Sequence, residues 1–142
     1  MEGGSGSAIK VLLVEDNPMI AELRTEVFED LGCEVKTAAT ADDAFTALAS
    51  STRFDVLMTD VNLGHDQYDQ SGLEVARRAR ELRPHLPIVG YTAVFSESEI
   101  PMDEHPEIAQ WFIKGSLGLV PLRGAMEDVV RLGQEARAAR EE

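Results

Sequence analysis

The chain has 142 residues, the length of one ordinary domain, and its 44% hydrophobic and 27% charged residues are typical of a globular protein. The formal net charge of -13 at pH 7 argues against direct binding to nucleic acid, because a phosphate backbone requires a basic face. No apolar run approaches the roughly 20 residues that span a membrane, and no basic-then-apolar leader opens the chain, so we expect a cytoplasmic protein. The single cysteine, Cys33, excludes an intramolecular disulfide and predicts a thiol buried in the core.

Residues 1–7, MEGGSGS, have the composition of a flexible Gly/Ser tail, and we expect one folded domain over residues 8–142. The continuous apolar run over residues 8–16 predicts a strand buried on both faces. A helix should follow, with Asn17 as its cap, Pro18 in its first turn and Gly32 at its end. Apolar residues recur along it at helical spacing, at Ile20, Leu23, Val27 and Leu31.

Four further stretches have the pattern of strands, at residues 33–38, 53–60, 86–93 and 111–115. Helical periodicity predicts helices at residues 40–51, 71–84 and 120–142. Thr40 and Asp43 have the spacing of a capping box, with Asp in place of the usual Glu. Residues 94–110 fit no regular pattern, since Pro101 and Pro106 interrupt them, and we expect a short or irregular helix there.

The alternation of strands and helices predicts a parallel sheet with right-handed crossovers and helices on both faces, a three-layer α/β sandwich. In an open parallel sheet the functional crevice lies beyond the carboxyl ends of the strands. The predicted strands deliver polar side chains to this rim at Glu15, Asp16, Asp60, Thr92 and Lys114.

Three carboxylates at one rim repel one another unless a cation neutralises them, and a small set of hard oxygen ligands favours Mg²⁺. Lys114 and Thr92 opposite the metal would supply a positive charge and a donor to phosphate oxygens. A carboxylate can also be a nucleophile, and Asp60, on the third strand, is the most central candidate. Each residue alone also has an ordinary role, such as a helix cap for Asp16, but their conjunction predicts a metal and phosphate site.

The segments VLLVEDNP, DVLMTDVNL, IVGYTA and WFIKG resemble the receiver domains of two-component response regulators. The resemblance covers essentially the whole chain from Ile9 to the final helix, and the motifs are specific in combination. It implies the flavodoxin-like doubly wound (βα)5 sandwich with strand order 2-1-3-4-5.

The resemblance also implies roles for individual residues. Asp60 matches the phosphoacceptor, which receives a phosphoryl group from a phosphohistidine partner. Asp16 matches the acid that binds Mg²⁺ directly, and Glu15 its neighbour, which acts through water. Asn62 matches the position whose backbone carbonyl completes the metal set.

Three more positions match the switch of the family. Lys114 matches the lysine that pairs with the acyl phosphate, and Thr92 the hydroxyl that turns toward it. Trp111 takes the place of the usual Tyr or Phe switch ring, and because Trp is bulkier it could instead be a static ring that covers the surface.

Two departures from the family pattern lie near the predicted site. Gly115 replaces the proline that usually follows the lysine, where the family has a cis peptide bond. A cis bond before a residue other than proline costs about 2.5–4 kcal/mol, so the Lys114–Gly115 peptide could be trans. The loop Gly64–Ser71 lacks the usual Met-Pro and is extended. It is either a cover or partner-specificity element, with Asp66 or Asp69 tuning the metal, or a solvated insertion.

The resemblance implies a signalling domain rather than an enzyme, with a histidine kinase or histidine phosphotransfer protein as phosphodonor and a downstream protein as target. The fourth helix, fifth strand and fifth helix form the usual output and dimer surface of the family. Because Pro101 and Pro106 break the fourth helix, we expect any homodimer to depart from the usual symmetric form, and no output domain is expected within the chain. Two alternatives are an aspartyl-phosphate phosphatase, which would read Asp-x-Asp-x-Thr where this chain has Glu15-Asp16-Asn17-Pro18, and a flavodoxin-like cofactor-binding module, which would need a Ser/Thr/Gly-rich phosphate loop there.

Overall fold

A computed structural model describes residues 8–60, 71–92, 110–113 and 119–141. In chain order the elements are β1 (Lys10–Val14), α1 (Pro18–Asp30), β2 (Glu34–Ala38), α2 (Ala41–Ala49), β3 (Val56–Asp60), α3 (Ser71–Leu82), β4 (Ile88–Thr92), β5 (Gln110–Ile113) and α4 (Leu119–Glu141). The expected tail, the irregular helix at 94–109 and the loop from Gly64 lie outside the described residues. Gln110, expected to precede the last strand, is its first residue.

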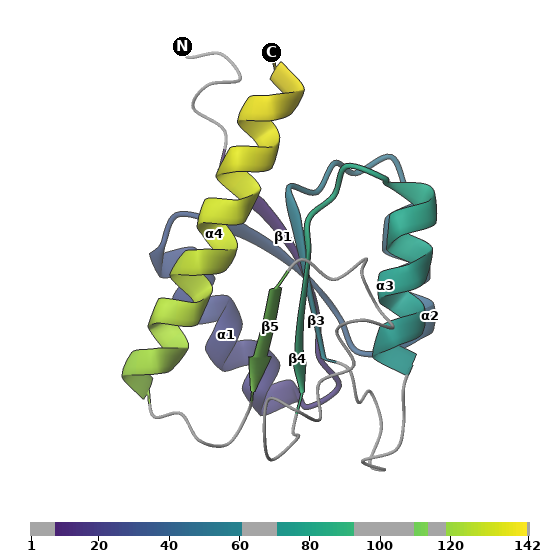
Figure 1. The fold of residues 1–142 in the computed structure, drawn as a ribbon. Helices are drawn as coiled ribbons and strands as arrows, with labels where there is room; N and C mark the ends of the chain where they lie inside the picture. The colour runs from purple at the N-terminus through teal and green to yellow at the C-terminus, as the bar shows by residue number, and fades with distance from the viewer. Residues whose placement is uncertain (1–7, 61–70, 93–109, 114–118, 142) are drawn as a thin grey trace.

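The strands form one parallel sheet in the order β2-β1-β3-β4-β5, which confirms the predicted topology. Helices α1 and α4 cover one face and α2 and α3 the other, so the domain has three layers (Figure 1). Side chains alternate between the faces of each strand. On β1, Leu12 and Val14 pack into the α2/α3 core, whereas Val11 and Leu13 pack into the α1/α4 core. Burial on both faces explains the continuous apolar run of β1.

The ends of the helices form where the sequence predicts them. The Asn17 side chain accepts hydrogen bonds from the backbone of Met19 and Ile20 at 3.0 and 3.2 Å, so it caps α1, and Pro18 is the first helical residue. Gly32 follows the end of α1 with a φ of 89°, a left-handed conformation that glycine adopts without strain. Thr40 caps α2 through the backbone N–H of Asp43, at 3.1 Å.

The inward face of α1 differs from the prediction at Leu23, whereas Val27 and Leu31 pack against the core as expected. Leu23 was expected on the apolar stripe, but it is 40% exposed. The neighbouring Arg24 points inward instead, and its side chain is 11% exposed. Phe28, one turn later, is fully buried, so the inward stripe follows the i, i+4 row through Arg24. Cys33 is buried in the α1/α4 core, as predicted.

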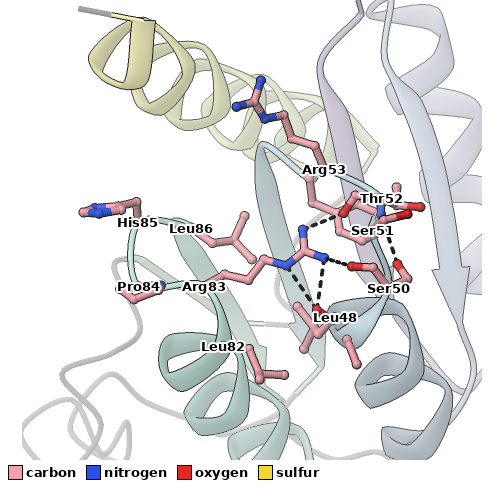
Figure 2. A pocket seen from close by; sticks show the side chains of 12 residues that line it. Leu48, Ser50, Ser51, Thr52, Arg53, Leu82, Arg83, Pro84, His85 and Leu86 are labelled. Atoms are coloured by element: carbon pink, nitrogen blue, oxygen red, sulfur yellow. Dashed lines mark hydrogen bonds between the residues drawn. The ribbon is translucent and has the colours of Figure 1, made fainter.

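A hollow of about 570 Å³ lies between the end of α2 and the turn from α3 to β4, and Arg83 forms its polar wall (Figure 2). The Arg83 guanidinium donates to the backbone carbonyl oxygens of Leu48, Ser50 and Thr52, at distances from 2.6 to 3.1 Å. These bonds satisfy carbonyls at the carboxyl end of α2, where a helix leaves acceptors unpaired. Arg83 therefore joins the end of α3 to the end of α2, and the polar groups that line the hollow have a structural role.

No helix within the described ranges combines the length and the apolar character needed to cross a membrane.

Candidate functional site

The register of the sheet brings acids from β1 and β3 to one rim. Val14 of β1 pairs with Thr59 of β3, and each of them is followed by an acid, Glu15 after Val14 and Asp60 after Thr59. Both strands run in the same direction, so their carboxyl ends meet at the same edge of the sheet. Asp16 follows Glu15 at the start of the turn into α1, and the third carboxylate reaches the same place.

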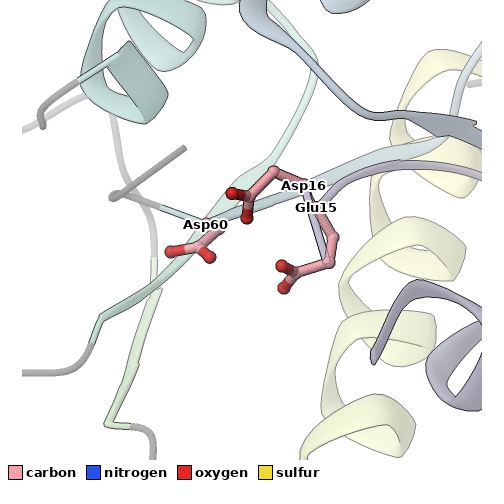
Figure 3. A group of neighbouring side chains, drawn as sticks. All are labelled: Glu15, Asp16 and Asp60. Carbon is pink, nitrogen blue, oxygen red and sulfur yellow. The ribbon is translucent and has the colours of Figure 1, made fainter. Parts of the chain in front are cut away.

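Glu15, Asp16 and Asp60 form a compact cluster, which we call the acid rim (Figure 3). Each residue offers a carboxylate oxygen, and these oxygens all lie within 4.8 Å of one another. Glu15 is 3% exposed and Asp60 1% exposed, whereas Asp16 is half-buried. Carboxylates this close and this poorly solvated repel one another, which favours a bound cation.

The donor set fits Mg²⁺. Carboxylate oxygens are the hard ligands that this ion prefers, and Mg²⁺ usually takes only one or two carboxylates and keeps several waters. Asp16 and Asp60 suit direct ligation, because one is half-buried and open to solvent while the other ends a rigid buried strand. The acid rim therefore has the donor atoms and the spacing of a candidate metal site.

Glu15 is held from two sides. Its Oε2 accepts a hydrogen bond from the backbone N–H of Asn17 at 3.0 Å, and its Oε1 accepts one from Arg24 Nη1 at 2.8 Å. Arg24 and Glu15 form an ion pair whose side chains are 11% and 1% exposed. These contacts fix the orientation of the Glu15 carboxylate, and its role toward a metal stays a prediction.

The backbone of one further predicted residue, Thr92, reaches the same rim, whereas that of Trp111 does not. Asp60 pairs with Tyr91 of β4, and Thr92, the last residue of that strand, comes directly after it. Trp111 of β5 pairs with Gly90, in the body of the sheet. Asn62, Lys114 and Gly115 lie outside the described residues, so the roles of these positions stay predictions.

The sequence analysis missed two buried ion pairs, Glu15–Arg24 and Asp55–Arg137. The first had a readable signal, because Arg24 lies four residues after Ile20 and four before Phe28, on a row that should be apolar. The second joins residues 82 apart in the chain, and no local pattern marks such a contact.

The fold and the acid rim define a parallel α/β domain with a cluster of carboxylates at the carboxyl edge of its sheet. The profile of the family described as "Response regulator receiver domain" matches residues 11–105. The chain belongs to this family of two-component signalling proteins, and it is a signalling module rather than a classical enzyme. The match separates it from the phosphatase and flavodoxin-like alternatives.

Known proteins agree with this assignment. The chain is 34% identical over 93 residues to "Probable transcriptional regulatory protein TcrX" of Mycobacterium tuberculosis, and the aligned region covers 66% of this chain but only 38% of TcrX. A CheY-like receiver domain protein from Methanospirillum hungatei has the same fold, with a TM-score of 0.76 and 22% identity over 94% of this chain and 99% of that one. TrrA from Thermotoga maritima, solved in complex with Mg²⁺-BeF, has a TM-score of 0.67 and 24% identity over 85% of this chain and 98% of TrrA.

Proposed function

We propose that Asp60 is a phosphoacceptor, which takes a phosphoryl group from a phosphohistidine partner in a Mg²⁺-dependent reaction. The observation that carries the proposal is the convergence of three carboxylate oxygens within 4.8 Å at the end of the central strand β3. The transferred group then changes the conformation of the domain and thereby its contact with a downstream protein.

The transfer exchanges one bond to phosphorus for another. An oxygen of Asp60 attacks the phosphorus, the O–P bond forms, and the N–P bond of the phosphohistidine breaks. The electron pair of the broken bond returns to the imidazole nitrogen, which takes a proton. Asp60 suits the role because β3 is buried along its whole length and holds the carboxylate in one place.

The metal is proposed to be held by Asp16 and Asp60 directly, by Glu15 through water, and by the backbone carbonyl of Asn62. When bound, Mg²⁺ neutralises charge on the acid rim and on the phosphoryl oxygens. The Mg²⁺-BeF complex of TrrA supports this proposal, since TrrA shares the fold of this chain.

Lys114 and Thr92 complete the proposed site. Ile113, the last residue of β5, pairs with Thr92, and Lys114 is the next residue in the sequence, which supports a place for both near the acid rim. We propose that Lys114 pairs with the negative charge of the acyl phosphate. Thr92 supplies the switch hydroxyl, and Trp111 is the switch ring. The bulk of Trp111 and the replacement of proline by Gly115 are the features in which this switch departs from its relatives.

The proposed partners follow from the family. Receiver domains pair with histidine kinases, so the donor is a histidine kinase or a histidine phosphotransfer protein. We propose a cytoplasmic domain over residues 8–142, a downstream protein target and no direct contact with nucleic acid or membrane. Any homodimer is proposed to depart from the usual symmetric form of the family, because Pro101 and Pro106 interrupt the segment that corresponds to its fourth helix.

The test is labelling by acetyl phosphate in the presence of Mg²⁺, with intact-protein mass as the readout. The wild type should gain one phosphoryl group, and Asp60→Asn should gain none, because the amide is not a nucleophile. Chelation of Mg²⁺ should also abolish labelling. Asp30→Asn is the matched control, since Asp30 is an exposed acid at the other end of α1, and it should label like the wild type. Equal labelling of Asp60→Asn, or no labelling of any variant, would overturn the proposal.

A further inference from the structure

Arg24 occupies a place on α1 where an apolar residue is expected. It lies one turn after Ile20 and one turn before the fully buried Phe28, on the side of the helix that faces the sheet. Its Nη1 donates to Glu15 Oε1 at 2.8 Å, so a nearly buried cation lies directly behind the acid rim. Both ions of a buried pair lose their hydration, so such a pair adds little to the stability of the fold. The position of the pair beside the acid rim therefore needs another explanation.

We propose that Arg24 is a positioning residue that lowers the cation affinity of the acid rim by pairing with Glu15. The inference rests on the proposed Mg²⁺ site. Arg24 offsets one of the three negative charges of the rim, so that an arriving cation is attracted mainly by Asp16 and Asp60. The pair acts on the cation as a nearly neutral unit.

The second hydrogen bond of Glu15 strengthens this arrangement. Because Oε2 accepts from the backbone of Asn17 and Oε1 from Arg24, rotation of the carboxylate toward the cation would break at least one charge-assisted hydrogen bond. Arg24 therefore holds Glu15 behind the direct ligands. A rim that carries less negative charge also repels the anionic phosphodonor less before the metal binds.

The first measurement is calorimetric titration of the full chain with Mg²⁺ alone. Arg24→Met retains an unbranched, flexible side chain and removes the charge, and it should bind Mg²⁺ about tenfold more tightly than the wild type. Arg24→Lys retains the charge and should stay within about threefold of the wild type. The matched control is Arg123→Met, which removes the same charge from an exposed pair with Asp30, and its affinity should change by less than about twofold.

The second measurement is a double-mutant cycle, which tests whether Arg24 acts through Glu15. Glu15→Gln alone leaves the Arg24 charge beside the rim and should weaken Mg²⁺ binding about tenfold. Addition of Arg24→Met to Glu15→Gln should recover most of that loss, because both charges of the pair are then absent. Circular dichroism confirms folding, and if Arg24→Met does not fold, the comparison of Glu15→Gln with the double variant decides the question.

The inference would be overturned if Arg24→Met bound Mg²⁺ no more tightly than the wild type. It would also be overturned if the double variant bound Mg²⁺ as weakly as Glu15→Gln, because Glu15 would then itself be a direct ligand. In both cases the wild type would still bind Mg²⁺ and label with acetyl phosphate, and the proposed function would stand. A wild type that neither binds Mg²⁺ nor labels would overturn both.

Discussion

The strand β3 has a buried acid at each end, and the two acids lie in opposite electrostatic surroundings. Asp55, directly before the strand, is 1% exposed and accepts hydrogen bonds from Arg137 of α4, to Oδ1 at 3.3 Å and to Oδ2 at 2.5 Å. The backbone N–H of Lys10 also donates to its Oδ2 at 2.9 Å. Asp60, at the other end, is also 1% exposed, but it converges with two further carboxylates.

Burial of an acid therefore does not by itself indicate a functional site, since Asp55 and Asp60 are equally buried. Asp55 is compensated by a cation of the same chain, and Arg137 also donates to the carbonyl oxygen of Ala8 at 2.7 Å, so the pair fastens α4 to the amino edge of the sheet. The acid rim brings three carboxylates together, of which Glu15 pairs with Arg24, and such a concentration of acids suits a ligand of opposite charge. The ion pair at the amino edge of the sheet has a structural role, whereas the acids at the carboxyl edge form the proposed metal site.

The largest expected effect is at the amino edge. Asp55→Asn leaves Arg137 without its carboxylate in a poorly solvated place, and removal of one partner of a buried pair costs about 3–5 kcal/mol. Urea unfolding measures this loss, and acetyl phosphate labelling of the folded fraction should be retained. The double variant Asp55→Asn/Arg137→Met should regain part of the stability. A loss below about 1 kcal/mol would show that the pair does not fasten the helix.

A smaller effect of opposite sign is expected at the carboxyl edge. Asp60→Asn removes one carboxylate from the acid rim, whose three acids outnumber the one cation, Arg24, that pairs with Glu15. It should raise the free energy of unfolding by about 1 kcal/mol in the absence of Mg²⁺. Mg²⁺ at roughly ten times its Kd should stabilise the wild type by about 1.4 kcal/mol and the variant much less. Thermal unfolding with and without Mg²⁺ measures both effects. Destabilisation of Asp60→Asn without metal would contradict the view of the acid rim as a site of net repulsion.

The close packing of α4 on the amino edge gives a third prediction. A Cβ at Gly133 would lie 3.0 Å from Ile9 Cγ2 and 3.2 Å from Val56 Cγ1, so Gly133→Ala should destabilise by about 1 kcal/mol even after its gain in helix propensity. Gly124→Ala, in the same helix with nothing within 4 Å, should stabilise by about 0.5–1 kcal/mol. Chemical unfolding of both variants measures the difference, and equal effects at the two positions would argue against tight packing at Gly133.

The smallest effect concerns Cys33, which reports on the charge of Asp55. Burial, with a contribution from the negative charge of Asp55, raises the pKa of Cys33 to about 11. Because the thiol of the unfolded chain ionises near pH 8.5, the folded state retains the proton longer, and stability is lost as the pH rises from about 9 towards 11. At pH 9 the loss should be about 0.8 kcal/mol relative to Cys33→Ala, measured by urea unfolding. An identical pH dependence of the two proteins would contradict it.

Much of the fold could be predicted from local sequence. The caps Asn17 and Thr40, the turn at Gly32 and the apolar runs of β1 and β3 each depend on neighbouring residues, and each forms where expected. The acid rim could also be predicted, because Glu15, Asp16 and Asp60 end two apolar runs and parallel strands share one carboxyl edge.

The sequence by itself thus determined the order of the elements, the parallel sheet, the family and the acids at the end of its strands. Only the tertiary structure decided that Arg24 rather than Leu23 faces the sheet, because the rotation of α1 about its axis depends on how it packs against β1, β2 and α4. It alone also decided that Asp55 meets Arg137, since the partners of a buried charge are set by contacts between distant segments rather than by neighbours in the chain.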